Sequence, residues 1–263
     1  MVRYRCEAGI GHIVLDRPEA LNAMNVAMLQ GLLTALEEAV VDESARAVII
    51  TGAGEKAFSG GADIKFLARA GPLEVRALAR LAVAANQRIE SLGKPVIAAL
   101  NGYALGGGLE LAEACALRVA AAHAVLGHPE VQIGAIAGFG GTTRLPRLVG
   151  KGRAADLLLT GRVIGADEAL DIGLVNRVVP ARQLMAAAEA LALEIAARSA
   201  IAVRLTWEAL HRGLNMTLEE SASLGADYFG LVAASPEFRT GTAAFISRDR
   251  HFGDRHFGDT HRE

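Results

Sequence analysis

Short apolar runs alternate with longer segments of helical periodicity in the first two-thirds of the chain. The runs at 47–51 and 95–100 are almost wholly apolar, which is typical of strands covered on both faces. Residues 26–40 repeat apolar side chains at the spacing of one helix face, and Asn25 is a suitable N-cap. Further strands are expected at 11–16 and 118–122, and helices at 73–92 and 109–117. This alternation predicts βαβ units with right-handed crossovers.

The pattern changes beyond about residue 150, where helical periodicity dominates and little after Val179 is typical of a strand. The helices expected in this region are 153–160, 166–172, 181–198, 200–213 and 217–234. The sequence therefore predicts an α/β core followed by a helical appendage. A length of 263 residues agrees with one large domain and a small addition to it.

Charge and cysteine content exclude several classes of protein. The net charge of −2 is spread along the chain without a basic cluster, which argues against a nucleic-acid partner. No run approaches the ~20 apolar residues that span a bilayer, and the N-terminus lacks the apolar segment of a secretory signal. Cys6 and Cys115 are far apart, which predicts neither a disulfide framework nor a metal site and favours the reducing cytoplasm.

Two glycine-rich segments, 59–63 and 101–108, each follow an apolar strand and precede a helical segment. Backbone N–H groups at a helix N-terminus are unpaired and lie at its positive end. Two of them aimed at one point would form an oxyanion hole. Each segment alone is more typical of a tight turn than of a binding site. The glycines at 52–54 lack the spacing of a phosphate-binding loop, and no dinucleotide-binding fingerprint follows the first strand.

Two glutamates are the candidates for acid–base chemistry. Glu110 comes two residues after the second glycine run, and Glu130 follows His128-Pro129. Both have apolar neighbours, and carboxyl groups in apolar surroundings have raised pKa values that suit proton transfer near neutral pH. However, a glutamate in the first turn of a helix also interacts favourably with the helix dipole, and a glutamate after proline is often a solvated loop residue. The residues alone leave both interpretations open.

With these motifs the chain resembles the crotonase, or enoyl-CoA hydratase/isomerase, family from Leu15 to about Arg248. The matching segments are LDRPEALNAMN at 15–25, AFSGGADIK at 57–65, NGYALGGGLELA at 101–112, GHPE at 127–130 with GGT at 140–142, and TGR at 160–162 with ADEAL at 166–170. The resemblance implies an α/β spiral of ββα and βαβ turns at 1–195 and a helical trimerisation region at 196–263. It further implies homo-oligomers, either trimers or dimers of trimers.

The resemblance also implies a reaction and its residues. The amides of Ala62 and Gly107 would hold the oxygen of an acyl-CoA thioester, and Glu110 and Glu130 would act on water as base and acid. Both acids are present, which is typical of enoyl-CoA hydratases, which make 3-hydroxyacyl-CoA without a metal or another cofactor. The implied substrate contacts are Ala57, Ser59, Gly60, Asp63, Ile64, Phe66, Tyr103, Gly106, Pro129 and Gly138, although Asp63 is also a suitable N-cap.

Several alternatives stay open. Other reactions of this family, such as double-bond isomerisation or C–C hydrolysis, use the same framework. A non-catalytic acyl-CoA- or RNA-binding protein and a purely structural oligomer are the remaining classes. Phe66 replaces a glutamate that is common in the family, which leaves the acyl group and the pathway, including fatty-acid β-oxidation, undetermined. Arg144 and Arg147 are candidates for CoA phosphate contacts or for structural roles.

Overall fold

A computed structural model describes the backbone of residues 1–257 and the side chains of residues 1–247. The chain divides into two compact units, residues 1–197 and 198–263. The first unit contains every strand found in the described residues, and the second is helical.

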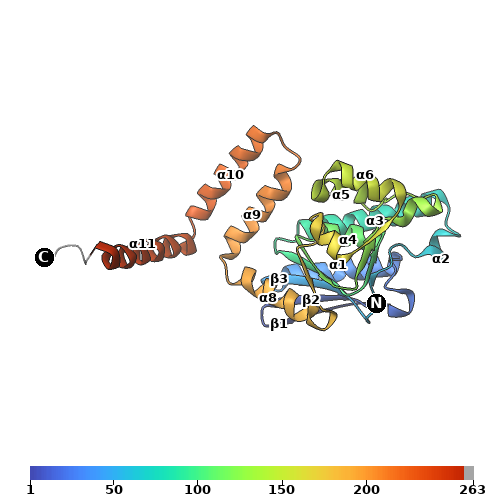
Figure 1. The fold of residues 1–263 in the computed structure, drawn as a ribbon, viewed down its shortest axis with the longest axis horizontal. Helices are drawn as coiled ribbons and strands as arrows, with labels where there is room; N and C mark the ends of the chain where they lie inside the picture. Colours follow the sequence, from blue (N-terminus) through green and yellow to red (C-terminus); the bar gives the residue numbers. More distant parts are fainter. Residues whose placement is uncertain (258–263) are drawn as a thin grey trace. The chain divides into compact units, whose positions relative to one another are not determined.

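Two sheets form the framework of the first unit (Figure 1). The larger sheet has the strand order β1 (Val2–Glu7), β2 (Ile10–Leu15), β3 (Ala47–Gly52), β5 (Val96–Leu100), β7 (Leu117–Ala121) and β10 (Arg177–Val179). The smaller sheet has the order β4 (Ala57–Ser59), β6 (Tyr103–Leu105), β8 (Val125–Gly127) and β9 (Val163–Gly165). All neighbouring strands are parallel except the pairs β1–β2 and β8–β9.

The order of elements along the chain makes these sheets a spiral. Strands β3, β5 and β7 of the larger sheet are each followed by one short strand of the smaller sheet and then by helical segments. Those segments are α2 (Ile64–Leu67) with α3 (Pro72–Glu90), then α4 (Gly107–Ala114), then a 3-10 helix (Pro129–Ile133) with α5 (Gly141–Val149) and α6 (Lys151–Thr160). The expected α/β spiral is confirmed.

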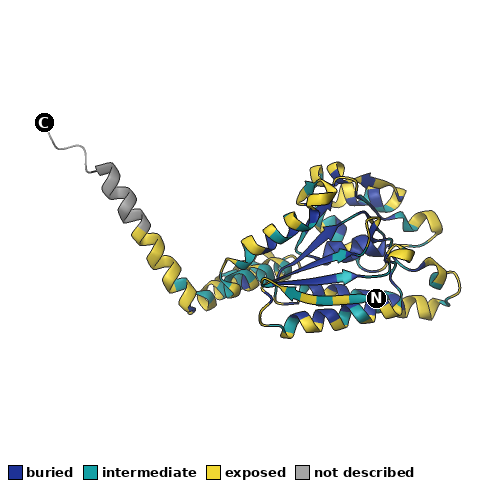
Figure 2. Cartoon of the chain, turned by 90° about the horizontal axis from the view of Figure 1, so that it is seen from below, coloured by how far each residue is buried: buried dark blue, intermediate teal, exposed yellow. Residues whose placement is uncertain are grey.

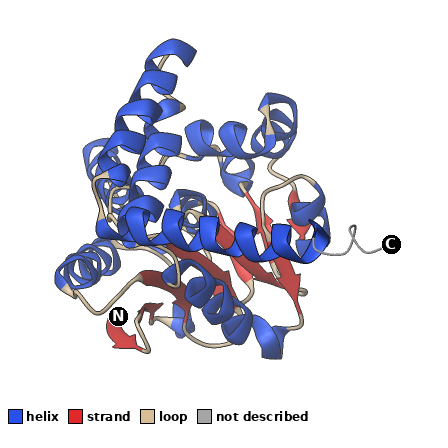
Figure 3. Ribbon diagram, turned by 90° about the vertical axis from the view of Figure 1, so that its left-hand side faces the viewer, coloured by secondary structure: helices blue, strands red, loops and turns tan. Residues whose placement is uncertain are grey.

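The central strands are covered on both faces, as their apolar runs predict (Figures 2 and 3). Ile49 and Ile97 pack in a cluster with α8 (Leu184–Ala196). Val48 and Ile50, on the opposite face, belong to the main core with α1 (Val26–Val41) and α3. Successive side chains of a strand point to opposite faces, so a strand between two helical layers must be apolar at every position.

Side-chain caps fix where two helices begin. The Asn25 side chain accepts a hydrogen bond from the Met28 N–H at 2.9 Å, which confirms Asn25 as the N-cap of α1. Asp63 caps α2 by accepting hydrogen bonds from the N–H groups of Lys65 and Phe66. Helix α4 has no side-chain cap, and all eight of its residues are buried. Its N-terminus therefore lies inside the protein.

The structure corrects several expected elements. The helix expected at 109–117 is α4, which begins at Gly107 and ends at Ala114, because β7 already begins at Leu117. Six strands, β1, β4, β6, β8, β9 and β10, and helices α5 and α11 were not among the expected elements. All of these strands except β1 are only three residues long, which is too short for a period to be recognised, and α5 begins at a glycine and contains Pro146. The helix expected at 181–198 begins with a 3-10 turn before α8.

The second unit consists of α9 (Ala200–Gly213), α10 (Leu218–Ala233) and α11 (Pro236–Phe257). Arg212 of α9 donates hydrogen bonds to Glu208 and to Tyr228 of α10, which ties the first two helices together. The rings of Phe229 and Phe238 meet edge to face at 5.9 Å and join α10 to α11. No helix of the described part of the chain is both long enough and apolar enough to cross a membrane.

Candidate active site

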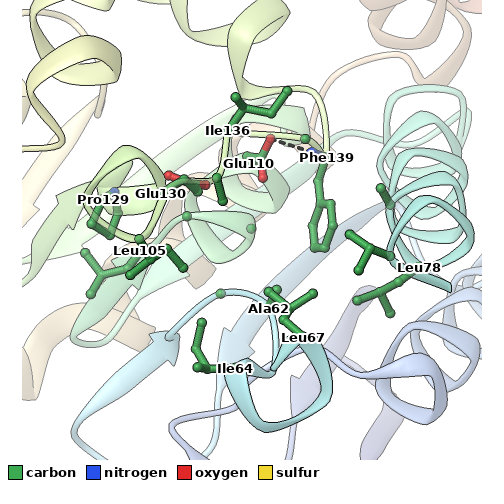
Figure 4. A pocket seen from close by; sticks show the side chains of 18 of the residues that line it. Ala62, Ile64, Leu67, Leu78, Leu105, Glu110, Pro129, Glu130, Ile136 and Phe139 are labelled. Atoms are coloured by element: carbon green, nitrogen blue, oxygen red, sulfur yellow. Dashed lines mark hydrogen bonds between the residues drawn. The ribbon is translucent and has the colours of Figure 1, made fainter. Parts of the chain in front are cut away.

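A cavity of about 910 Å³ lies in the first unit and is lined by both glycine-rich segments, by α3 and by residues 129–139 (Figure 4). Its volume is in the range typical of pockets for small molecules. Much of the wall is apolar, formed by Leu67, Val75, Leu78, Ile133, Ile136 and Phe139. The cavity therefore suits a ligand with an apolar portion and a few polar atoms.

The two glycine-rich segments meet at this cavity because β4, which leads into the first segment, and β6, which lies within the second, are parallel neighbours. A Cβ atom on Gly61, whose φ is +98°, would lie 2.7 Å from the Leu105 carbonyl oxygen and 3.3 Å from the Gly107 nitrogen. A Cβ atom on Gly107 would lie 3.5 Å from the Ala62 nitrogen. The amides of Ala62 and Gly107 are therefore close together, and glycine is required where the segments touch.

Both amides have a free N–H group. Neither Ala62 nor Gly107 donates a hydrogen bond to a backbone carbonyl of any described residue. Gly107 is the first residue of α4, where N–H groups have no acceptor within the helix and the helix dipole is positive. Both residues line the cavity. The pair can hold an oxygen atom that becomes negative during a reaction.

Glu110 lies one turn further into α4 and is 1% exposed. Its Oε1 atom accepts hydrogen bonds from the N–H groups of Phe139 and Gly141, both at 2.7 Å. Burial raises the pKa of Glu110 to about 7, although the Gly141 N–H opposes this effect. The carboxyl group is thus divided between its two protonation states near neutral pH, where it can accept or donate a proton.

Glu130 faces the same cavity from the 3-10 helix (Figure 4). Its two carboxylate oxygens are buried and accept no hydrogen bond from the described residues. A Cβ atom on Gly106 would lie 2.9 Å from Glu130 Oε1, so the absence of a side chain there makes room for the carboxylate. Glu110 and Glu130 are close enough to influence each other electrostatically. The cavity therefore holds two carboxyl groups and two free amides.

Helices α3 and α5 hold the segment that binds Glu110. Asn86 and Arg144 both donate hydrogen bonds to the Phe139 carbonyl, at 3.1 and 3.3 Å. Arg144 also makes two hydrogen bonds with the carboxylate of Glu90, at 2.6 and 2.8 Å. These contacts hold the carbonyl of the residue whose N–H binds Glu110, and they give Arg144 a structural role. Arg147 donates to the Thr143 carbonyl.

Nine of the predicted site residues line the cavity, namely Gly60, Ala62, Ile64, Gly106, Gly107, Glu110, Pro129, Glu130 and Gly138. The other five lie outside its wall, namely Ala57, Ser59, Asp63, Phe66 and Tyr103.

Each of the five outlying residues has another environment. The Ser59 hydroxyl donates to the Asn22 carbonyl, and Asp63 accepts a hydrogen bond from Arg17 at 2.7 Å. Phe66 packs against the main core, and Tyr103 is 44% exposed. Ala57 lines a separate cavity of about 320 Å³. Contact of these five residues with a substrate stays a prediction.

Sequence reasoning missed a third buried carboxyl group, that of Glu113, and its partner His128. Nε2 of His128 lies 2.8 Å from Oε1 of Glu113, and both side chains are fully buried. The available signals were the positions of Glu113, three residues after Glu110 on one helix, and of His128, two residues before Glu130. The apolar wall from α3 was also missed, because periodicity shows which helix face is buried but not whether that face borders a cavity.

Comparison with known proteins extends these observations. The model of the family described as enoyl-CoA hydratase/isomerase matches residues 5–255. The chain is 42% identical over 242 residues to the crotonyl-CoA hydratase of Syntrophomonas wolfei, covering 92% of this chain and 93% of that protein. It is 41% identical over the same length to the short-chain-enoyl-CoA hydratase of Clostridium acetobutylicum, with the same coverage.

Solved structures have the same fold. The crystal structure of an enoyl-CoA hydratase from Bacillus anthracis has a TM-score of 0.90 to this chain at 39% identity, covering 94% of this chain and 96% of that one. A subunit of an enoyl-CoA hydratase from Geobacillus kaustophilus has a TM-score of 0.89 at 38% identity, covering 94% and 95%. The similarity thus covers both the spiral and most of the helices after it.

Proposed function

Because the chain belongs to the enoyl-CoA hydratase/isomerase family, we propose that it adds water across the 2,3 double bond of a 2-enoyl-CoA thioester. The product is a 3-hydroxyacyl-CoA, and the enzyme is a hydro-lyase. One observation carries the proposal: two buried carboxyl groups, Glu110 and Glu130, face a cavity whose wall also presents the free amides of Ala62 and Gly107.

The two amides activate the substrate. The thioester carbonyl oxygen accepts hydrogen bonds from the N–H groups of Ala62 and Gly107, which draws electrons from the conjugated double bond and makes the β-carbon electrophilic. Negative charge grows on this oxygen in the enolate-like transition state, and the loss of one such donor typically costs about 3 kcal/mol. The apolar wall of the cavity lowers the local dielectric constant and strengthens this interaction.

The two glutamates handle the protons. Glu110 removes a proton from a water molecule as its oxygen bonds to the β-carbon, and Glu130 supplies a proton to the α-carbon. The two hydrogen bonds from Phe139 and Gly141 hold Oε1 of Glu110, so its Oε2 atom is the one directed to the water. The water oxygen forms a bond to the β-carbon, the α-carbon gains a proton, and the reaction is redox-neutral. The two amides and the two carboxyl groups supply the activation and the proton transfers, so the proposed reaction requires no metal or redox cofactor, and CoA enters as part of the substrate.

We further propose that the chain forms homo-oligomers, either trimers or dimers of trimers, through its second unit. Large apolar side chains are exposed on α10 and α11, namely Leu218, Phe229, Leu231, Phe245 and Ile246. Exposed apolar surface of this extent is typical of an interaction surface. The cytoplasmic location inferred from the sequence stays a prediction.

The direct test is incubation of the purified protein with crotonyl-CoA. We expect loss of the conjugated thioester absorbance and formation of 3-hydroxybutyryl-CoA, identified by mass spectrometry. The variants Glu110→Gln and Glu130→Gln should each lower kcat by ~10²-fold or more, since each removes one proton-transfer group. Glu38→Gln, at an exposed position of α1, is the matched control and should leave kcat unchanged.

Absence of hydration with crotonyl-CoA and with longer and branched enoyl-CoA substrates would contradict the proposal. Mass spectrometry of the same mixtures would then reveal double-bond isomerisation or hydrolysis, the other reactions that this framework supports.

A further inference from the structure

Directly behind Glu130 lies a buried pair that the reaction described above does not use. His128 Nε2 lies 2.8 Å from Glu113 Oε1, and Nδ1 of the same ring lies 3.7 Å from Glu130 Oε1. The imidazole thus stands between two carboxylates, one inside the core and one at the cavity. Nδ1 has no hydrogen-bond partner among the described residues, so the nearest charge on that side of the ring is Glu130.

The ring is held in this orientation by its surroundings. The side chain of His128 is fully buried, and a Cβ atom on Gly141 would lie 2.8 Å from its Cε1 atom. The first turn of α5 therefore packs directly on the imidazole. The Glu113 carboxylate fixes the other side of the ring through Nε2. The ring has little freedom to turn away from Glu130.

The charged groups around the pair come from four elements. Helix α4 supplies Glu110 and Glu113, and the 3-10 helix supplies Glu130. Strand β7 supplies Arg118 and α5 supplies Arg144, and both interact electrostatically with Glu113. Burial disfavours a charged imidazole, but the hydrogen bond with Glu113 and the nearby Glu130 outweigh that effect and raise the pKa of His128. Burial also raises the pKa of Glu113, an effect that the same hydrogen bond opposes. The 2.8 Å contact between the two groups favours the pair of imidazolium and carboxylate.

Resting on the proposed hydratase function, we propose that His128, oriented by Glu113, is a positioning residue that stabilises the negative charge on Glu130 as this group gives its proton to the substrate. The positive ring faces the carboxylate from outside the cavity and does not touch the substrate. Its effect is larger when Glu130 is charged than when it is neutral. It therefore stabilises the state after proton transfer more than the state before it, which is the condition for an effect on kcat.

If the pair of His128 and Glu113 had a purely structural role, a different experimental result would be expected. Burying two charged groups costs hydration free energy, and the attraction between the groups often only offsets that cost. A purely structural pair can therefore be replaced by neutral groups of similar shape with little loss of stability. Such a replacement would change stability without changing how the rate depends on pH. The role proposed here requires both the rate and its pH dependence to change.

The experiment compares pH profiles of kcat for the wild type, His128→Gln and Glu113→Gln. Glutamine keeps hydrogen-bonding capacity at position 128 but cannot become positive. We expect kcat of His128→Gln to fall about tenfold and one limb of the profile to move to higher pH by about one unit, with KM nearly unchanged. Glu113→Gln should shift the same limb in the same direction. His12→Gln alters another buried histidine, on β2 and away from the cavity, and should leave the profile unchanged.

The charge of His128 is measured separately, by ¹⁵N NMR of histidine-labelled protein at pH 8, with His128→Gln to assign the signal. An imidazolium signal supports the proposal whether or not a variant folds poorly. A neutral ring at that pH, or a His128→Gln profile that superimposes on the wild-type profile, would overturn it. If the wild type itself hydrates no enoyl-CoA, the proposed function fails instead, and the NMR measurement shows whether the buried charge exists.

Discussion

Glu110 is subject to two opposing influences at the scale of single residues. Burial among apolar groups favours the neutral carboxyl group, whereas the N–H groups of Phe139 and Gly141 favour the carboxylate. Their balance places the pKa of Glu110 at about 7, well above its ordinary value of 4.5. A group poised in this way serves proton transfer near neutral pH, but it also lowers the stability of the folded protein when it ionises.

Replacement of Glu110 by glutamine should therefore stabilise the protein in a pH-dependent way. The folded-state pKa is raised, so the contribution of Glu110 to stability is fully present below pH 4.5 and is lost as the pH rises through about 7. The stability of Glu110→Gln relative to the wild type should rise between pH 5 and pH 8, by at most about 3 kcal/mol. Thermal unfolding at one protein concentration measures it.

The matched control for that experiment is Glu38→Gln, whose difference from the wild type should not change over the same pH range because the side chain is exposed. A relative stability of Glu110→Gln that falls as the pH rises would contradict the assigned direction of the pKa shift.

The candidate acids were found from sequence, but their surroundings were not. Glu110 and Glu130 have local signals, a glycine run before one and a His-Pro dipeptide before the other. The contact between Glu113 and His128 joins residues fifteen positions apart, in different elements. No local pattern encodes such a distance, because it depends on how α4 and β8 are placed by the spiral. The same reason explains why the hydrogen bond from Ser59 to the Asn22 carbonyl was not expected, whereas the N-cap role of Asp63, which is local, was.

At the scale of elements, the parallel pairing of β4 with β6 brings the two glycine-rich segments together. Gly61→Ala should destabilise the protein by about 1–3 kcal/mol, because alanine is strained at a φ of +98° and its Cβ would press on the Leu105 carbonyl. Gly152→Ala is the control, since a Cβ there meets nothing within 4 Å and alanine favours the helix.

Chemical denaturation of the two glycine variants measures the difference. The Gly61 interpretation is wrong if both variants have the same midpoint of unfolding. Activity provides a second measurement, since displacement of the neighbouring Gly107 amide should lower kcat of Gly61→Ala with crotonyl-CoA.

Helix α5 is linked to α3 through Arg144, and this link should matter for catalysis. Lysine at position 144 cannot make both hydrogen bonds to Glu90 and still reach the Phe139 carbonyl. We expect Arg144→Lys to lower kcat about tenfold, because the amide that orients Glu110 is held less firmly. Steady-state kinetics with crotonyl-CoA checks this.

Arg162→Lys is the matched control for Arg144→Lys, since Arg162 also pairs with carboxylates, those of Asp156 and Glu168, but at the surface. It should change kcat little. Equal losses of activity in the two variants would show that the effect is not specific to the site.

At the scale of the whole molecule, the α/β spiral could be predicted because its long central strands and amphipathic helices have clear periods and its motifs resemble a known family. The smaller sheet could not be predicted, because each of its strands has only three residues and is recognisable as a strand only from its pairing with a neighbour. Strands β9 and β10 lie in the region beyond residue 150 that was expected to be mostly helical. They were not predicted because they too have only three residues each.

The second unit should determine the oligomeric state. Leu231 on α10 is 56% exposed, and replacement by aspartate would place a charge in the proposed interface. We expect Leu231→Asp to form smaller species than the wild type in light-scattering measurements after size-exclusion chromatography. Val41→Asp, at an apolar position of the first unit that is 76% exposed, is the control. An unchanged mass for Leu231→Asp would remove α10 from the proposed interface.

The way in which the spiral assembles the cavity separates chemistry from selectivity. Consecutive turns contribute the Ala62 amide, then Gly107 with Glu110, then Glu130, and each of these follows a short strand of the smaller sheet. The apolar wall from α3 belongs to a connection between turns and supplies no reacting group. The part of the cavity wall that comes from α3 can therefore change by substitution within one helix without altering a reacting group.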